Sequence, residues 1–290
     1  MLLAEIANIA SRDGISLGEL AVSLESEESG ISPAEVRSRM AAFLMVMRQA
    51  AEEGLSHAER TSRSRLSGGD AYKVMNRYIE GNIFPGNEVL ARSVAYALAI
   101  SETNASMGKI VAAPTAGSCG VIPGCFLSVA QALNLSDDVL IDSLCAAGII
   151  GQCIASKASL SGAEGGCQAE CGSAAAMAAA GLAQMGGGSP VVCINAAAIA
   201  IKGLMGLVCD PVAGLVEVPC VKRNATSAAV ALASAEMALS GVTSVIPPDE
   251  VVQAMAQVGR SIPESLRETS MGGLAATQTA QLLAKTILGQ

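Results

Sequence analysis

The sequence predicts an all-α fold, a compact multi-helix domain in which Gly- and Pro-rich loops carry cysteines. Hydrophobic residues make up 51% of the chain but aromatic residues only 2%, so Ala, Leu, Val, Ile and Met supply most of the apolar content. Ala, Leu and Met favour helices. Two-residue alternation of apolar and polar side chains is scarce, and the best strand candidate is the short LVEV at 215–218.

Two helix starts are marked near the N-terminus. Ser16 with Glu19, and Ser32 with Glu35, match the capping box, in which both residues satisfy free backbone N–H groups. Pro33 stands at the first helical position, where proline is tolerated. One face of the second helix is apolar at Val36, Met40, Phe43, Leu44, Met47 and Ala51.

Three further helices are expected along the rest of the chain. Ser136, followed by two aspartates, begins a helix that runs toward Ile150, and the segment PPDE at 247–250 begins the last one. Apolar residues at helical spacing are Leu90, Val94, Ala97 and Leu98 in one helix, and Val251, Met255 and Val258 in the last.

The chain of 290 residues is long enough to bury a sizeable core, and we expect one domain over 1–290. Residues 1–60 are more charged than the middle and are expected to form a peripheral helical layer or a separate lobe. The polar segment TSRSRLSGGD at 61–70 separates them from a core over 61–290 that holds the cysteine-bearing loops.

Charge and apolar patterning exclude several partners. The net charge of −8 offers no basic face for phosphate backbones, so nucleic acid is not an expected partner. The N-terminus carries Glu5 and shows no basic-then-apolar signal, so a cytoplasmic location is expected. Two uncharged runs, 110–136 and 171–201, have the length of membrane spans. Because glycines and prolines interrupt both, we interpret them as core and expect no membrane partner.

Nine cysteines without a secretion signal argue against a disulfide framework. Buried small residues, a reactive thiol and metal ligands remain as explanations, with burial the commonest for any one cysteine. Three loops combine cysteine with hydroxyl or carboxylate residues, and such loops often carry sites. They are APTAGSCGVIPG at 113–124, SLSGAEGGCQAECG at 159–172 and CDPVAGLVEVPC at 209–220.

The single histidine, His57, lies in a polar stretch and is expected to be exposed. Ser-His-Asp and Cys-His catalysis within the chain are therefore poorly supported, and any metal needs thiolate or carboxylate ligands. Cys167 and Cys171 would share a helix face, which leaves a metal pair and a core residue both open. Cys209 and Cys220 are too far apart for ferredoxin or zinc-finger spacings.

Four segments, in order, resemble one known family. They are APTAGSCGVIPG, SGAEGGCQAECGSAAAMAAAG, GLVCDPVAGLVEVPCVKRNA and the late RETSMGGLA. The chain resembles the α subunit of bacterial iron–sulfur-dependent L-serine dehydratase (L-serine ammonia-lyase). The resemblance spans most of the chain and is densest from about 105 to 226.

The resemblance implies a [4Fe–4S] cluster held by three cysteines, which here are Cys167, Cys209 and Cys220. Cys171 lies outside the shared positions and is interpreted as core, and Cys119 is not assigned as a ligand. Three thiolates leave one iron open as a Lewis acid. That iron would bind the serine hydroxyl, stabilise the departing hydroxide and acidify the α-proton. Aminoacrylate then tautomerises and hydrolyses to pyruvate and ammonia.

Supporting roles follow from neighbouring residues. Lys222 and Arg223 are expected to meet the substrate carboxylate, unless they are a surface pair. Ser161 or Glu164 is expected to orient the amino group. Asp210 is expected to cap the loop or tune the cluster.

Three polar residues are expected to hydrogen-bond substrate or cluster sulfides: Thr115, Ser118 and Asn224. The general base is not identified and is expected from another chain. Single-polypeptide members of the family carry an additional N-terminal portion with an SSHT-type motif, which this chain lacks. The resemblance therefore implies a separate β subunit. The final KTILGQ has no cysteine to offer the cluster.

Three alternatives stay open. A related iron–sulfur enzyme would act on L-cysteine or threonine. A pyridoxal-phosphate β-eliminase would need a Schiff-base lysine, best placed at Lys157, and a phosphate loop at 186–188, although a helix-ending turn is commoner there. A non-catalytic helical subunit would use its cysteines only as core.

Overall fold

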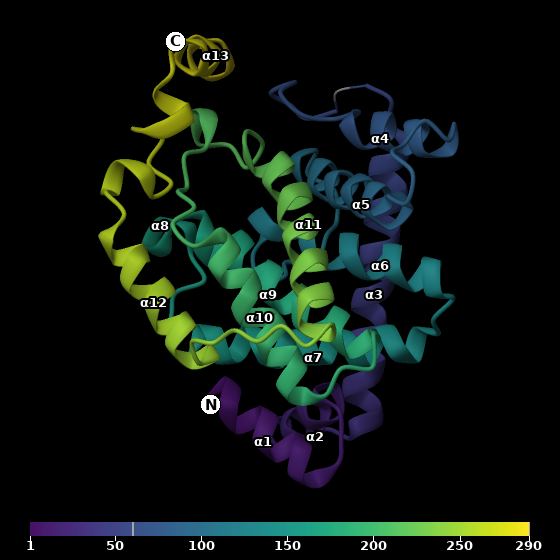
Figure 1. Ribbon diagram of the computed structural model, residues 1–290. Coiled ribbons are helices and arrows are strands. Elements are labelled where there is room, and N and C mark those ends of the chain that lie inside the picture. The colour runs from purple at the N-terminus through teal and green to yellow at the C-terminus, as the bar shows by residue number, and fades with distance from the viewer. Residues whose placement is uncertain (60, 290) are drawn as a thin grey trace.

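The computed structural model describes residues 1–59 and 61–289, and helices dominate this part of the chain (Figure 1). Its β pairing is confined to one isolated bridge between Cys209 and Arg267. The all-α prediction is therefore confirmed. The α-helices are α1 (Leu3–Asp13), α2 (Leu17–Ser29), α3 (Pro33–Ser56), α4 (Asp70–Ile79), α5 (Glu88–Ala105), α6 (Val121–Leu133), α7 (Asp137–Ala155), α8 (Gly162–Gly165), α9 (Ser173–Met185), α10 (Pro190–Leu204), α11 (Cys220–Leu239), α12 (Pro248–Ser261) and α13 (Gln278–Leu288).

The best strand candidate in the sequence, 215–218, forms no strand. This segment turns between the short helix η3 (Val212–Gly214) and α11. The Val212 N–H donates to the Val218 carbonyl at 2.8 Å, and the Glu217 N–H donates to the Leu215 carbonyl at 2.7 Å. The backbone therefore satisfies itself within the loop, and no neighbouring strand is needed.

The predicted helix starts form as expected at α2 and in part at α3. The Ser16 side chain accepts from the Glu19 N–H at 2.9 Å, and the Glu19 carboxylate accepts from the Ser16 N–H at 2.8 Å, which completes a capping box. Ser32 caps α3 in the same way, but the Glu35 carboxylate turns to Arg39 at 2.9 Å instead.

The N-terminal helices α1 to α3 cover the bundle. In Figure 1, α1 and α2 lie at one end of the molecule, and α13 lies at the opposite end. Leu3, Leu17 and Leu44 are fully or almost fully buried in the same apolar cluster as residues of α7 and α9. Two residues predicted on buried faces are exposed instead, Phe43 by 49% and Leu90 by 36%.

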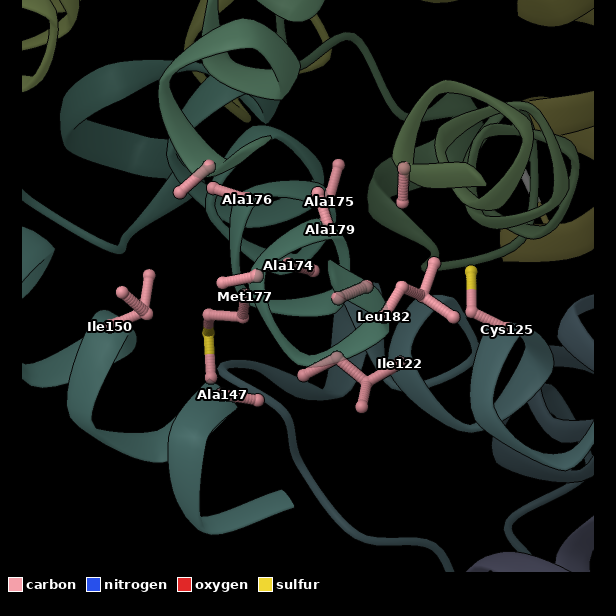
Figure 2. Close-up of a cluster of buried hydrophobic side chains, with 14 of the residues drawn as sticks. Ile122, Cys125, Ala147, Ile150, Ala174, Ala175, Ala176, Met177, Ala179 and Leu182 are labelled. Carbon is pink, nitrogen blue, oxygen red and sulfur yellow. The ribbon is translucent and has the colours of Figure 1, made fainter. Parts of the chain in front are cut away.

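Helix α9 occupies the centre of the core, and its small side chains set the packing distance. Figure 2 shows Met177 of α9 pointing toward Ala147 and Ile150 of α7, and Leu182 of α9 beside Ile122 and Cys125 of α6, while Ala175, Ala176 and Ala179 point to the other side. Gly181 lies so close to the Phe126 ring that a Cβ atom would clash with it. The Ala-rich composition thus serves close helix packing.

The uncharged runs pack inside the protein. Two helical segments are long and apolar enough to cross a membrane by length and composition alone: Ala116–Leu133, within the first run, and Asp137–Ala155, which follows that run. In each of them 67% of the segment is buried within the fold. The run 171–201 is divided between α9 and α10, whose alanines are almost all buried. Interior packing accounts for the apolar composition of these segments.

Candidate active site

Three separate chain segments bring cysteines together. Cys167 stands at the start of the π-helical turn η2 (Gln168–Gly172), Cys209 lies just before η3, and Cys220 is the first residue of α11. Cys167 and Cys209 form a buried cluster with Cys171, while Cys220 is partly exposed. Two of the three predicted cluster ligands are therefore packed together, and Cys220 lies near enough for Cys167 to raise its pKa.

Hydrogen bonds of the backbone fix these segments. The Cys209 N–H donates to the Leu266 carbonyl at 2.9 Å, and the Glu268 N–H donates to the Cys209 carbonyl at 2.8 Å. This clamp places the late motif RETSMGGLA directly on the CDPV segment. Gln168, which follows Cys167, donates to the Met255 carbonyl at 2.8 Å and accepts from the Gly206 N–H at 2.8 Å. Its buried amide thus ties three parts of the chain together.

The thiols influence one another. The pKa of Cys167 is lowered, first by a hydrogen bond from Cys171 and also by the nearby Arg223 guanidinium, although burial opposes both. The same contact with Cys167, together with burial, raises the pKa of Cys171. Burial raises the pKa of Cys209, and it raises that of Cys220 to about 12, with Cys167 adding to both. Cys167 is therefore the thiol best prepared to become a thiolate.

Thiols are the main soft ligands that this site offers. Within residues 1–59 and 61–289, no three His, Cys, Asp or Glu side chains are placed to hold a single metal ion. In a four-iron cluster, each thiolate binds a different iron. Thiols from three segments, with Arg223 beside Cys167, are the residue types that such a cluster would use.

Arg223 belongs to this site. Its guanidinium lies 2.8 Å from the Asp210 carboxylate and donates to the Val208 carbonyl at 2.7 Å. The two side chains of the ion pair are only 16% and 4% exposed. Asp210 also accepts from the Leu274 N–H at 2.8 Å, so this carboxylate links Arg223 to the late motif.

Lys222 points elsewhere. Its ammonium donates to Asp70 at 2.8 Å and its side chain is 54% exposed. Asp70 begins α4 and also pairs with Lys73 at 2.9 Å. The two neighbouring basic residues therefore have separate surroundings.

The first loop reaches the site through its polar residues. The Thr115 hydroxyl lies 3.2 Å from that of Ser118 and donates to the Glu170 carboxylate at 2.8 Å. Asn224 is buried and braces the loop: it accepts from the Gly120 N–H at 2.9 Å and donates to the Gly117 carbonyl at 2.7 Å. Thr115 is thus the residue of this group with a direct contact to a site carboxylate.

Ser161 and Glu164 are both exposed. Ser161 precedes α8, and Glu164 helps to line a cavity of about 430 Å³ together with Lys157, Gln168 and Arg260. No described hydrogen bond or ion pair joins either side chain to the four site cysteines.

Comparison with known proteins assigns the chain to a family. A family described as "Serine dehydratase alpha chain" matches residues 12–275. This chain belongs to that family. The probable L-serine dehydratase alpha chain of Bacillus subtilis is 45% identical over 285 residues, which cover 98% of this chain and 94% of that protein. The L-serine dehydratase alpha chain of Peptoniphilus asaccharolyticus is 42% identical over 284 residues, which cover 98% of this chain and 97% of that protein.

A third relative differs in length. The L-serine dehydratase of Helicobacter pylori is 44% identical over 185 residues, which cover 63% of this chain but only 41% of that protein. The resemblance found in the sequence is thus confirmed at the level of the family.

One further residue of this serine dehydratase alpha chain family member belongs to the site but has no assigned role in the sequence prediction. Glu170 lies three residues after Cys167, and its Oε2 is 4.0 Å from the Cys209 sulfur. Burial raises its pKa. Cys171, interpreted from the sequence as core, is buried and packs with Cys167 and Cys209. The spacing Cys167–Glu170–Cys171 is the one sequence signal that could have indicated both.

The remaining predictions about single residues are consistent with the structure. His57 is exposed at the end of α3. Cys119 is buried in a separate cluster with Ala50, Ala51 and Ile100, so it lies apart from the site cysteines.

Proposed function

We propose that this chain is the α subunit of an L-serine dehydratase, a carbon–oxygen lyase that converts L-serine to pyruvate and ammonia. Cys167, Cys209 and Cys220 would hold its [4Fe–4S] cluster. The observation that carries the proposal is the convergence of these three cysteines, from three distant segments, in a chain of the serine dehydratase alpha chain family. The names of its relatives support serine as the substrate.

A separate β subunit is part of the proposal. Two relatives that match over almost their whole length are named alpha chains. In contrast, the Helicobacter pylori relative has no chain designation in its name, and this chain covers only 41% of it. The general base for the α-proton is proposed to lie on that β subunit, because the one histidine of this chain, His57, is exposed and has no described contact with the site cysteines. Because free thiols persist in a reducing environment, we also propose a cytoplasmic location.

When bound, a cluster with three protein ligands supplies an open Lewis-acidic iron for the departing hydroxide. The residues of the chain prepare the surroundings. Arg223 offsets the negative charge of the Cys167 thiolate, and Asp210 holds Arg223 in place. Of the two basic residues that follow Cys220, Arg223 is therefore better placed to attract a substrate carboxylate. The Thr115 hydroxyl contacts Glu170 Oε1, and the Ser118 hydroxyl lies beside that of Thr115.

The pyridoxal-phosphate alternative finds less support. Residues 186–188 end α9, and Gly186 packs against Leu239. Lys157 follows α7 and lies in the cavity with Glu164 and Arg260. The two parts that such an enzyme needs have no described contact with each other.

The experiment is anaerobic purification of the chain together with its β partner, followed by assays of iron, acid-labile sulfide and pyruvate formation. We expect a broad brown absorbance that air bleaches, and pyruvate from L-serine. A narrow absorption band abolished by borohydride, or a colourless protein without iron, would refute the proposal. Turnover of L-threonine and L-cysteine in the same assay decides among the related substrates.

A further inference from the structure

Glu170 is an acidic side chain at the site without a cationic partner. Asp210 is paired with Arg223, and Asp70 is paired with Lys222 and Lys73. Glu170 instead accepts a hydrogen bond from Thr115 at 2.8 Å, and no ion pair in the described part of the chain includes it. A partly buried carboxylate usually has a positive partner, so the missing charge calls for an explanation.

Two glycines from different loops leave room around this carboxylate. A Cβ atom on Gly117 would lie 2.9 Å from Glu170 Oε1. A Cβ atom on Gly162 would lie 2.7 Å from Glu170 Oε2 and 3.1 Å from the Cys209 sulfur. The first and second loops thus approach the Glu170 carboxylate with bare backbone. Side chains there would displace it from its position beside Cys209.

The contacts of Glu170 leave its Oε2 without a strong hydrogen-bond donor. Thr115 donates to Oε1 at 2.8 Å, and the Cys209 sulfur lies 4.0 Å from Oε2. A cation placed against Oε2 would therefore be attracted by the carboxylate.

We propose that Glu170 is a substrate-binding residue that receives the α-ammonium group of the amino-acid substrate. This rests on the proposed serine dehydratase function. An amino acid is a zwitterion, so its ammonium group fits an unpaired carboxylate. Thr115 holds Oε1, which leaves Oε2 facing the cysteine side for the ligand. Glu170 thereby selects 2-amino acids over 2-hydroxy acids.

The test compares three variants of the anaerobically purified holoenzyme with its β partner. Glu170→Gln removes the charge at nearly constant shape, Glu170→Asp keeps it, and Glu164→Gln changes the other acid of the same motif. The ligands are D-serine and D-glycerate, which differ only in an ammonium or a hydroxyl group at C2. Inhibition constants for both, and KM and kcat for L-serine, are measured, with iron content as the check on the cluster.

We expect Glu170→Gln to raise the inhibition constant of D-serine at least about tenfold and to change that of D-glycerate by less than about twofold. The reason is that a charged hydrogen bond is lost for D-serine only. KM for L-serine rises by a similar factor, and Glu170→Asp recovers part of the difference. Equal weakening of both ligands, or a shift of the ratio in Glu164→Gln alone, would overturn the inference. If the wild type itself lacks iron and serine turnover, the proposed function fails instead.

Discussion

Two adjacent basic residues show how strongly position decides the role of a side chain. On a helix, neighbouring residues point about 100° apart, because 3.6 residues make one turn. Lys222 therefore reaches Asp70 at the protein surface, while Arg223 turns inward to Asp210 beside Cys167. The sequence predicts one shared role for Lys222 and Arg223, but in the structure the two side chains have different partners.

This difference predicts unequal effects on stability. Arg223→Ala leaves the buried Asp210 without its cation, so we expect a loss of about 3 kcal/mol or more in unfolding free energy. Lys222→Ala removes an exposed ion pair, and the expected loss is below about 1 kcal/mol. Urea unfolding of both variants and the wild type measures the two values. Equal losses would contradict the assignment of Arg223 to the interior.

Glu102 predicts a pH effect outside the cysteine site. This side chain is 2% exposed and accepts from the Asp70 N–H at 2.9 Å at the start of α4. Burial raises its pKa above the ordinary value of 4.5, although the hydrogen bonds from Asp70 and Ala71 oppose the shift. The folded state therefore binds a proton more tightly than the unfolded state does. Its contribution to stability is complete below pH 4.5 and is lost as pH rises through the raised pKa.

In Glu102→Gln this contribution no longer depends on pH, while the side chain can still accept the backbone hydrogen bonds. Thermal unfolding between pH 4 and pH 8 should thus show a smaller decline with rising pH in the variant than in the wild type. Identical pH profiles for the two proteins would show that Glu102 has the same pKa folded and unfolded.

Among the elements, close contact between helices explains the many small residues. Gly54 of α3 faces the backbone of Ala99 in α5, where a Cβ atom would overlap the Ala99 carbonyl. Gly148 of α7, in contrast, has no atom within 4 Å of the position of a Cβ. Both glycines lie within helices, but only the first is required by packing.

Substitutions at the two positions should therefore change the free energy of unfolding in opposite directions. Gly54→Ala forces α3 and α5 apart and should lower the free energy of unfolding by about 1–3 kcal/mol. Gly148→Ala lowers the conformational freedom of the unfolded chain and should stabilise by about 0.5–1 kcal/mol. Thermal unfolding of the matched pair measures both. Stabilisation by both substitutions would mean that α3 and α5 do not approach as described.

The polar segment 61–70 also makes contacts that its composition does not predict. Besides separating the N-terminal helices from the core, it touches the third cysteine loop. Ser64 donates to the buried Glu217 at 2.8 Å, and Asp70 at its end pairs with Lys222. Both partners lie more than a hundred residues away in the sequence.

For the whole molecule, local patterns predicted the helices α2, α3, α5, α7 and α12, and the resemblance to a family suggested the three cysteine ligands. Capping residues and apolar spacing act within a few residues, so they are readable in sequence. The role of Glu170 was not readable, because Thr115, Gly162 and Cys209 approach it from three different loops. The sequence prediction names the exposed Glu164 of the same motif and does not consider Glu170. Contacts between distant loops depend on the packed fold.

The proposed cluster connects these observations, and the iron bound by single-cysteine variants tests it. Cys167→Ala, Cys209→Ala and Cys220→Ala should each lose most iron, sulfide and brown absorbance after anaerobic purification with the β partner. Cys193→Ala changes a buried thiol of the apolar core and should keep them. Full iron content in any of the first three variants, or equal loss in Cys193→Ala, would contradict a cluster held by Cys167, Cys209 and Cys220.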